Sequence, residues 1–339
     1  MLTKEQMFQE LNEKTFNPMN DVAFKFIFGK EERKNITLDF LDAFLYERLE
    51  HHITGITYKN TELVPLAEDG KLTRLDVRCD LSSGEQVDVE VQVLNLKNMR
   101  RRTLYYWAQM YLFSLARGQT YRDLKPAITI NILAFELLPQ KEPLAMYTIM
   151  NPETGDELNK DLSLFFVEIP KFAREPKKKI SEMTKMERWM AYFANQLDDH
   201  EREELAMSDA AISGAMDAAR VFLADDDERW NYINRQMAIL DYNSGIQDSR
   251  EEGLREGLKE GRREGWKEGR KEGRKEGQRE GRREGIGIGR VGMLAELVRD
   301  GVLTLGQAAE KAGMTEKEFQ KAMESPEIDK NFPITRKTT

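Results

Sequence analysis

Two neighbouring segments of alternating polarity constrain the fold of this chain more than any other feature. Residues 71–81 (KLTRLDVRCDL) and 86–94 (QVDVEVQVL) place apolar side chains at odd positions, from Leu75 onward, and polar side chains at even positions. Successive side chains of a strand point to opposite faces, so each segment predicts a β-strand with one apolar and one polar face. The connecting SSGE predicts a hairpin turn between them.

The register of this hairpin decides which polar side chains meet. In an antiparallel pair, the two apolar faces coincide only if the loop contains an odd number of residues. A three-residue loop at Ser83–Glu85 places Asp76 opposite Gln92, and Arg78 opposite Glu90. Asp76 and Glu90 then become diagonal neighbours, about 7–8 Å apart at the backbone and within reach of a shared ion.

The polar face of this hairpin is acidic, and two interpretations of it are open. An alternating strand often exposes its polar face to water, which would solvate the charges. The second interpretation is a divalent cation, because Mg²⁺ binds through one or two carboxylates together with substrate phosphates. Such an ion polarises a phosphodiester and activates water. The acidic residues concerned are Asp76, Asp80, Asp88 and Glu90.

The segments after the hairpin predict an α/β fold. Residues 98–117 have the pattern of an amphipathic helix that ends at Gly118. Residues 127–136 (AITINILAFE) are almost continuously apolar, which is typical of a central strand buried on both faces. Residues 164–169 predict a further strand, and residues 18–48 predict helices interrupted near Gly29. Strands and helices in this order are typical of an α/β domain.

Composition narrows the possible chemistry and environment. Cys79 is the only cysteine, so an intramolecular disulfide framework is excluded and a reducing, cytoplasmic location is expected. One cysteine and three histidines do not favour a zinc site, whereas carboxylates suit a hard cation. The net charge of −8 argues against non-specific coating of nucleic acid, although a local basic groove remains compatible with it. No apolar run is long enough to predict a membrane partner.

A glycine repeat and a short tail follow the α/β region. Between residues 253 and 285, glycine recurs at every fourth position, and each glycine follows a glutamate. A dimerising helix and a flexible linker are both compatible with this repeat, and the first interpretation predicts a homo-oligomer. In the tail, Thr304 and Thr315 begin two capping-box patterns separated by Gly313. This arrangement resembles a helix-turn-helix that binds either DNA or a protein.

Several segments, taken in order, resemble a known family. They are NPMNDVAFKFIFG at residues 17–29, then LDVRCD, VDVEVQ, RRTLYYWAQMY and LKPAITINIL, and residues 241–253 before the repeat. The chain resembles, over about residues 17–285, the recombination-promoting nuclease and transposase family of the PD-(D/E)XK nuclease superfamily. The superfamily signature is matched by Asp76 and by Glu90-x-Gln92, with Gln92 in place of the usual lysine.

This resemblance implies a restriction-endonuclease-like core, in which a mixed sheet is flanked by helices. It also implies a Mg²⁺-dependent DNA endonuclease, with Mn²⁺ as a possible substitute, that is associated with recombination or a mobile element. The alternative is a weak or inactive nuclease-fold protein that binds DNA or a protein partner and oligomerises through the repeat. The expected regions are a nuclease-like core at 1–175, a helical extension at 176–250, the repeat at 251–290 and the tail at 291–325.

The resemblance also assigns expected roles to individual residues. Asp76 and Glu90 are expected to bind the metal, and Gln92 to orient the attacking water. Asp21 is a third expected metal ligand, or else a carboxylate that stabilises a helix N-terminus. The expected substrate-binding residues are Lys25, Arg102 and Tyr106, for which ordinary structural roles on their helices are the alternative.

Overall fold

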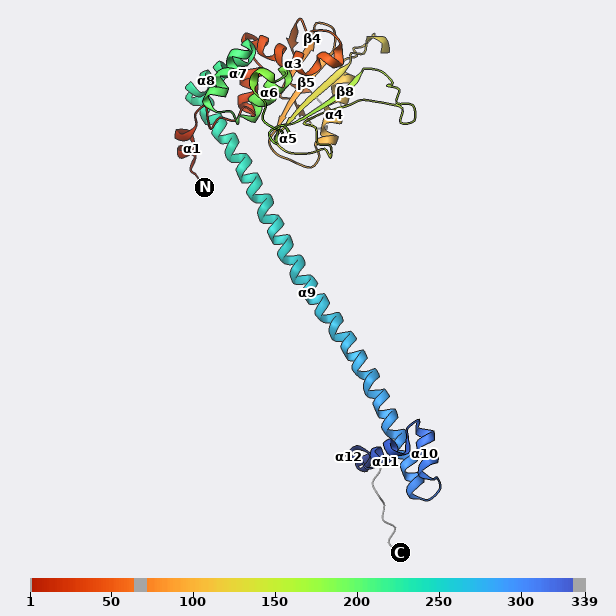
Figure 1. Ribbon diagram of the computed structural model, residues 1–339. Coiled ribbons are helices and arrows are strands. Elements are labelled where there is room, and N and C mark those ends of the chain that lie inside the picture. The colour runs from red at the N-terminus through yellow and green to blue at the C-terminus, as the bar shows by residue number, and fades with distance from the viewer. Residues whose placement is uncertain (1, 64–71, 332–339) are drawn as a thin grey trace. The chain divides into compact units, whose positions relative to one another are not determined.

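The computed structural model describes residues 2–63 and 72–331 (Figure 1). The chain divides into two compact units, Met1–Gly245 and Ile246–Thr339. Each unit has its own apolar core. The first unit contains the whole β-sheet, so the acidic hairpin belongs to it.

A six-stranded mixed sheet forms the centre of the first unit, which confirms the predicted α/β class. β5, β6 and β8 run parallel to one another, and the other neighbouring strands pair antiparallel. All seven residues of β6 are buried, as the apolar run predicted. In spatial order the strands are β1 (Ile56–Tyr58), β4 (Val77–Leu81), β5 (Gln86–Gln92), β6 (Ala127–Leu133), β8 (Leu162–Glu168) and β7 (Leu144–Tyr147). A separate two-stranded sheet pairs β2 (Glu62–Leu63) with β3 (Thr73–Arg74).

The hairpin between β4 and β5 exists, but the predicted register was wrong by two residues along β5. Val77 lies opposite Val89, and Arg78 lies opposite Asp88 rather than Glu90. The loop ends at Gly84, whose φ of +116° is a conformation that glycine adopts easily, and not at Glu85. The loop still has three residues, so both apolar faces coincide as predicted. The first predicted strand is also divided into β3 and β4, and Lys71 lies outside the described residues.

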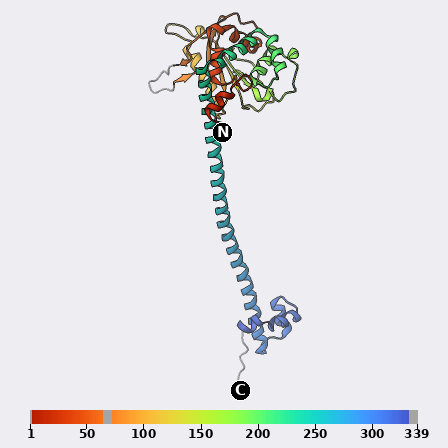
Figure 2. The same ribbon diagram turned by 90° about the vertical axis from the view of Figure 1, so that its left-hand side faces the viewer.

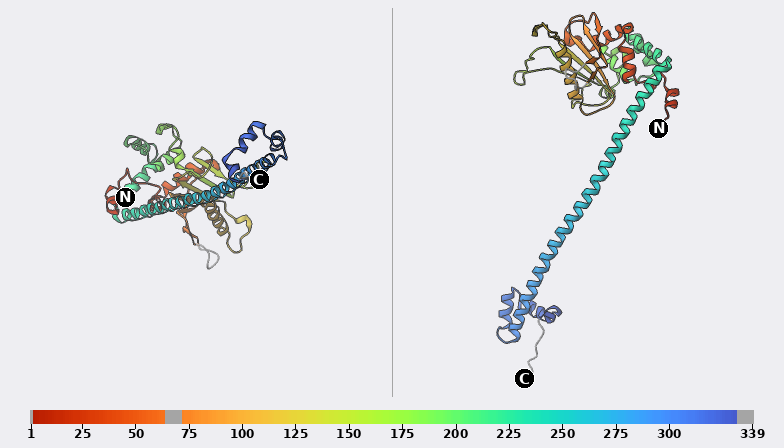
Figure 3. Two further views of the ribbon diagram at one scale, coloured as in Figure 1. Left: turned by 90° about the horizontal axis from the view of Figure 1, so that it is seen from below. Right: turned by 180° about the vertical axis from the view of Figure 1, so that it is seen from behind.

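Helices cover both faces of the sheet (Figure 3). The odd-numbered face of β5, with Val87, Val89 and Val91, belongs to the main core together with α2, α3, α6 and α8. The opposite face is covered by α4, whose Trp107 Nε1 donates to the carbonyl of Ala127 at 3.0 Å. The helices of the first unit are α1 (Lys4–Glu10), α2 (Asp21–Phe28), α3 (Lys34–Leu49), α4 (Met99–Phe113), α5 (Ile169–Phe172), α6 (Lys185–Ala194), α7 (Asp199–Ser208) and α8 (Ala210–Ala224).

The polar face of β5 is buried beneath α4. Asp88 and Glu90 are 0% and 1% exposed, so this face is not solvated by water, and that interpretation was wrong. Gln86 Nε2 donates to the carbonyl of Met110 in α4 at 3.2 Å. Because buried polar groups are costly unless they have partners, the acidic pair requires an explanation in the chemistry of the site.

Helix α2 ends at Gly29, where the sequence predicted an interruption, and it begins at Asp21, three residues after the start of the predicted helical range. The side chain of Asn20 accepts from the backbone N–H groups of Val22 and Ala23, at 3.0 and 3.4 Å, and thereby caps the helix. Gly29 ends the helix, and a Cβ at this position would lie 2.7 Å from the carbonyl oxygen of Lys25. The buried Phe24 and Ile27 fix this helix against the core, so Lys25 is held on a rigid element.

The start of α9 (Asp226–Arg299) packs against the N-terminal helix α1 (Figure 2). The rings of Phe8 and Trp230 stack with their centroids 4.5 Å apart. Lys4 Nζ also donates to Asn234 Oδ1 at 2.8 Å. These contacts anchor the first turns of α9 in the first unit, and its later turns belong to the second.

The second unit contains the glycine repeat and the tail. The repeat is helical throughout, and a Cβ built on any of its nine glycines would meet no atom within 4 Å apart from the neighbouring backbone of its own helix. Both predicted capping boxes are confirmed, at Thr304 and Thr315, and Gly313 has a φ of +73° between the two helices. The tail helices are α10 (Leu305–Ala312), α11 (Glu316–Met323) and α12 (Pro326–Asn331), of which α12 was not predicted. None of the described helices is long and apolar enough to cross a membrane.

Arg48 of α3 forms a partly buried ion pair that should stabilise the first unit. Arg48 Nη2 lies 2.6 Å from Glu157 Oε1, and Arg48 Nε donates to Ser163 Oγ at 2.8 Å. The hydrogen bonds from Arg48 and Thr148 lower the pKa of Glu157 from 4.5 to about 2. The carboxylate is therefore stabilised in the folded state above its unfolded pKa, and this stabilisation is lost as the pH falls through the folded pKa.

Substituting Arg48→Met should lower the free energy of unfolding by about 1–3 kcal/mol near neutral pH, because hydrogen bonds to charged groups are lost. The difference from the wild type should shrink as the pH falls from 4.5 towards 2. Urea unfolding at a series of pH values measures this difference. Lys34→Met on the same helix is the matched control, since its pair with Glu31 is more exposed. A difference that does not change with pH would contradict the assignment.

Candidate functional site

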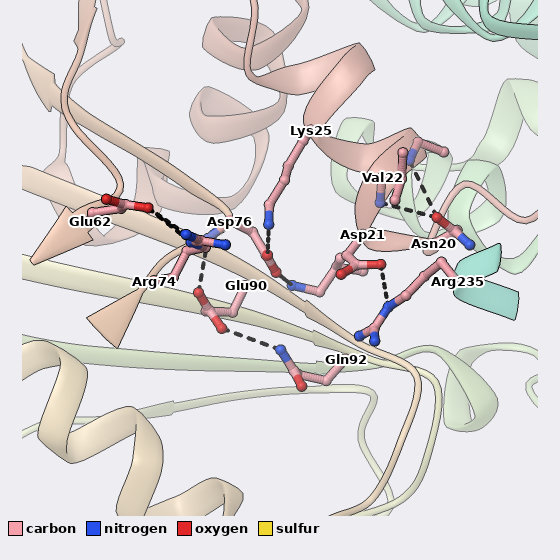
Figure 4. A network of polar contacts seen from close by, with 12 residues as sticks. Asn20, Asp21, Val22, Lys25, Glu62, Arg74, Asp76, Glu90, Gln92 and Arg235 are labelled. Carbon is pink, nitrogen blue, oxygen red and sulfur yellow. Dashed lines mark hydrogen bonds and ion pairs between the residues drawn. The ribbon is translucent and has the colours of Figure 1, made fainter. Parts of the chain in front are cut away.

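Asp76 and Glu90 meet at the start of the acidic hairpin. Asp76 lies in the bend immediately before β4, and the observed register, extended by one residue, places it directly opposite Glu90. The backbone N–H of Asp76 donates to Glu90 Oε1, and that of Val91 donates to Asp76 Oδ2, both at 3.0 Å. Figure 4 shows Asp76, Glu90 and Gln92 in one network of polar contacts. The two carboxylates are thus closer neighbours than the predicted register allowed.

Two cationic side chains reach this carboxylate pair from different layers of the fold. Lys25 Nζ, from α2, lies 2.9 Å from Asp76 Oδ1 (Figure 4). Arg102 Nη2, from α4, lies 2.8 Å from Glu90 Oε2. The side chains of Asp76 and Glu90 are 10% and 1% exposed, and a buried charge pair is tolerated only when opposite charges compensate it.

Gln92 and Tyr106 complete the arrangement around Arg102. Gln92 Nε2 donates to Glu90 Oε2 at 3.2 Å, and Gln92 Oε1 accepts from Arg102 Nη1 at 3.0 Å. Arg102 Nε donates to the hydroxyl of Tyr106 at 2.7 Å. Arg102 is therefore in direct contact with three other residues singled out in the sequence, which are Glu90, Gln92 and Tyr106.

The electrostatics of the pair follow from burial. Desolvation, together with the neighbouring Asp76 carboxylate, raises the pKa of Glu90 from 4.5 to about 8, whereas Arg102 opposes the shift. Burial also raises the pKa of Asp76, against the lowering effect of Lys25. A pair of carboxylates that resists ionisation has a strong tendency to gain a cation.

Asp88 lies deeper in the same face of β5. It is 0% exposed, and neither oxygen of its carboxylate has a hydrogen-bond partner among the described residues. Burial raises its pKa well above the ordinary value, and the charges of Glu90 and Asp76 raise it further. Asp88 is therefore a third buried carboxyl group at this site, and a bound cation would favour its ionised form.

Asp21 lies in the first turn of α2, and its Oδ1 accepts from Arg235 Nε of α9 at 2.7 Å (Figure 4). Its charge contributes to the raised pKa of Asp76. The described part of the chain contains no group of three or more His, Cys, Asp or Glu side chains arranged to bind a metal. The sequence carried no signal for Arg235, which is 214 positions away from Asp21.

The donor set at Asp76 and Glu90 fits a hard divalent cation. Mg²⁺ typically binds to one or two carboxylates and completes its coordination with water and phosphate oxygens. The oxygens that would serve as ligands are now paired with Lys25 on one carboxylate and with Arg102 on the other. Two carboxylates, one from the bend before β4 and one from β5, are chemically suited to such an ion, and a third is not required.

Comparison with known proteins identifies a family for this part of the chain. Residues 18–249 match the family model described as PD-(D/E)XK nuclease family transposase. This range contains the complete sheet and every residue of the candidate site. No curated protein and no solved structure matches the chain.

Proposed function

Because this chain belongs to the PD-(D/E)XK nuclease family transposases, we propose that it is a Mg²⁺-dependent DNA endonuclease. Its substrate would be a phosphodiester in DNA, and its role would lie in recombination or in the movement of a mobile element. The observation that carries this proposal is the opposed pair of Asp76 and Glu90, buried together with compensating cations on either side. Nucleases of this superfamily generally use divalent metals.

The residues of the site can be given roles under this proposal. Asp76 and Glu90 would hold Mg²⁺ or Mn²⁺, and Asp21 would add negative charge beside them. The bound cation would polarise the phosphodiester and make nearby water more acidic. Gln92 would orient the attacking water by hydrogen bonding. Lys25, Arg102 and Tyr106 border the carboxylates and would contact the DNA phosphate.

The test is a plasmid-cleavage assay with full-length protein and a titration of Mg²⁺ and Mn²⁺. Under this proposal, supercoiled plasmid is converted to nicked or linear products only when a divalent cation is present. Chelation by EDTA should stop the reaction, because the carboxylates then have no ion to hold. Cleavage that persists in EDTA would contradict the proposal.

A second function is a nuclease-fold protein that binds DNA or a protein without cutting. The specific observation in its favour is Gln92, because a glutamine side chain cannot carry the positive charge of a lysine. A protein that binds DNA but never cuts it with Mg²⁺ or Mn²⁺ would support this function. The assay above therefore separates the two.

The repeat supplies the proposed route to a homo-oligomer. Nine glycines each oppose helix formation by about 1 kcal/mol relative to alanine, so a lone helix of this sequence should be weak. A second copy packed along the glycine face would compensate, because glycine allows two backbones to approach closely.

Ending the chain at residue 250 should therefore convert an oligomer into a monomer, as measured by sedimentation velocity. The paired substitutions Gly261→Ala and Gly265→Ala are a second test, made in the full-length chain. They should raise the helicity, which circular dichroism measures, but weaken association, because two methyl groups occupy the approach face. A truncated chain that remains fully oligomeric would rule out the repeat as the interface.

A further inference from the structure

The structure leaves a question of charge at position 92. Phosphodiester cleavage places additional negative charge on the phosphate and the attacking oxygen, and catalysis requires donors or cations aimed at that charge. Gln92 is neutral, and its side chain contacts Glu90 of the carboxylate pair. The positive charge that a lysine would carry at this position must therefore come from another cationic side chain close to Gln92.

Arg102 is the cation in direct contact with Gln92. Its guanidinium donates through Nη1 to Gln92 Oε1 at 3.0 Å and through Nη2 to Glu90 Oε2 at 2.8 Å. Lys25 approaches from the other layer of the fold and pairs with Asp76 instead. We propose that Arg102 is a positioning residue that supplies the positive charge missing at position 92 and fixes the orientation of the Gln92 amide.

The orientation of the amide follows from the chemistry of its neighbours. A guanidinium has only N–H donors, so the atom of Gln92 that faces Arg102 must be the carbonyl oxygen. The amino group is then turned to Glu90, where Nε2 donates to Oε2 at 3.2 Å. This donation uses one N–H of the amino group, and the second N–H can donate to a water bound between the carboxylates. Arg102 thus makes Gln92 a donor towards the reacting water.

Arg102 is itself held rigidly. Tyr106, one helical turn further along α4, accepts from Arg102 Nε at 2.7 Å, and the guanidinium carbon lies 5.0 Å from the centroid of the Tyr106 ring. The Arg102 side chain is 24% exposed, whereas Arg101, the preceding residue, is exposed. A guanidinium that makes three hydrogen bonds through three different nitrogens has one geometry, as positioning requires.

The inference rests on the proposed nuclease function, and three variants of the full-length protein test it. Arg102→Met should lower kcat for plasmid cleavage by about 10²–10³-fold, as expected when one electrostatic donor is lost, with little change in KM. Gln92→Lys in the Arg102→Met background should restore most of the rate, because a lysine at position 92 returns a positive charge beside Glu90. Arg101→Met is the matched control, and it should cleave like the wild type.

Two binding measurements separate this role from a simple phosphate contact. Fluorescence anisotropy with a DNA duplex in EDTA should show that Arg102→Met raises Kd far less than it lowers kcat, because Arg102 is only one of three side chains expected at the phosphate. Calorimetric titration with Mg²⁺ should show binding to Arg102→Met at least as tight as to the wild type, because Glu90 is released from its ion pair.

The outcomes that overturn the inference are specific. If Arg102 only contacts phosphate, Arg102→Met will weaken DNA binding as much as it slows cleavage, and Gln92→Lys will not restore cleavage. If Arg102→Met cleaves as fast as the wild type, the inference fails while the nuclease function stands. A wild-type protein that does not cut with any divalent cation overturns the proposed function and this inference together.

Discussion

Replacing Glu90 with glutamine is expected to abolish divalent-metal-dependent cleavage and to make the metal-free protein more stable. The amide has the shape of the carboxylate, so the packing beneath α4 is kept, but an amide does not neutralise a bound cation. The loss of activity should be at least about 10³-fold, because the interaction with the transition-state charge disappears with the ion. Asp76→Ala should have the same effect on cleavage, since the two carboxylates act on one ion.

The gain in stability follows from the raised pKa of Glu90. Its folded pKa of about 8 lies above the ordinary value of 4.5, so the folded state binds the proton more tightly than the unfolded state. The stability of the wild type should therefore fall as the pH rises from 4.5 to 8, and glutamine removes this loss. On the basis of 1.36 kcal/mol per pKa unit, the gain should be on the order of a few kcal/mol above the folded pKa.

Urea unfolding in EDTA across this pH range measures the gain, and plasmid cleavage measures the loss. Glu62→Gln is the matched control, because Glu62 is an exposed carboxylate near the same hairpin, paired with Arg74 (Figure 4). It should change neither quantity. If the Glu90→Gln and wild-type stabilities ran parallel with pH, the buried carboxylate would not carry the electrostatic cost inferred for it.

The alternation of the hairpin predicted both strands and the faces of their side chains, because strand periodicity is a local property. It could not predict the register, since residues 82–84 and residues 83–85 of Ser-Ser-Gly-Glu can each form a three-residue loop. The positive φ of Gly84 settles that choice and brings Asp76 opposite Glu90. The sequence also could not show that the polar face lies beneath α4, because alternation does not reveal which element covers a face.

Some residues of the candidate site could also be recognised from the sequence, whereas their contacts could not. The spacing of Asp76, Glu90 and Gln92 could be recognised because all three lie on one hairpin. Lys25 and Arg102 came from the family resemblance, and the pairing of each with a particular carboxylate became clear only from the fold. Arg235 carried no local pattern at all, because its contact with Asp21 depends on how α9 packs against the first unit.

The buried ion pair between Lys171 and Glu168, at the end of β8, should contribute strongly to the free energy of unfolding. Lys171 Nζ lies 2.5 Å from Glu168 Oε2, and the two side chains are 3% and 0% exposed. Glu168 accepts from the backbone N–H of Leu138 at 3.1 Å, and Lys171 donates to the carbonyl oxygens of Leu138 and Gln140 at 2.9 and 2.6 Å. The pair therefore fastens the segment after β6 to the end of β8.

Lys171→Met should lower the free energy of unfolding by about 3–5 kcal/mol, because it leaves the carboxylate of Glu168 buried without its cation. The double variant Lys171→Met/Glu168→Gln should recover much of this loss, since it buries no unpaired charge. Arg174→Met, one turn later, is the matched control, because its pair with Glu136 is exposed and should contribute less than about 1 kcal/mol. Urea unfolding of the wild type, Lys171→Met, Glu168→Gln and the double variant measures the coupling between Lys171 and Glu168. If the double variant were as unstable as Lys171→Met, the loss would arise from the missing bonds to Leu138 and Gln140, and the buried charge would not be its cause.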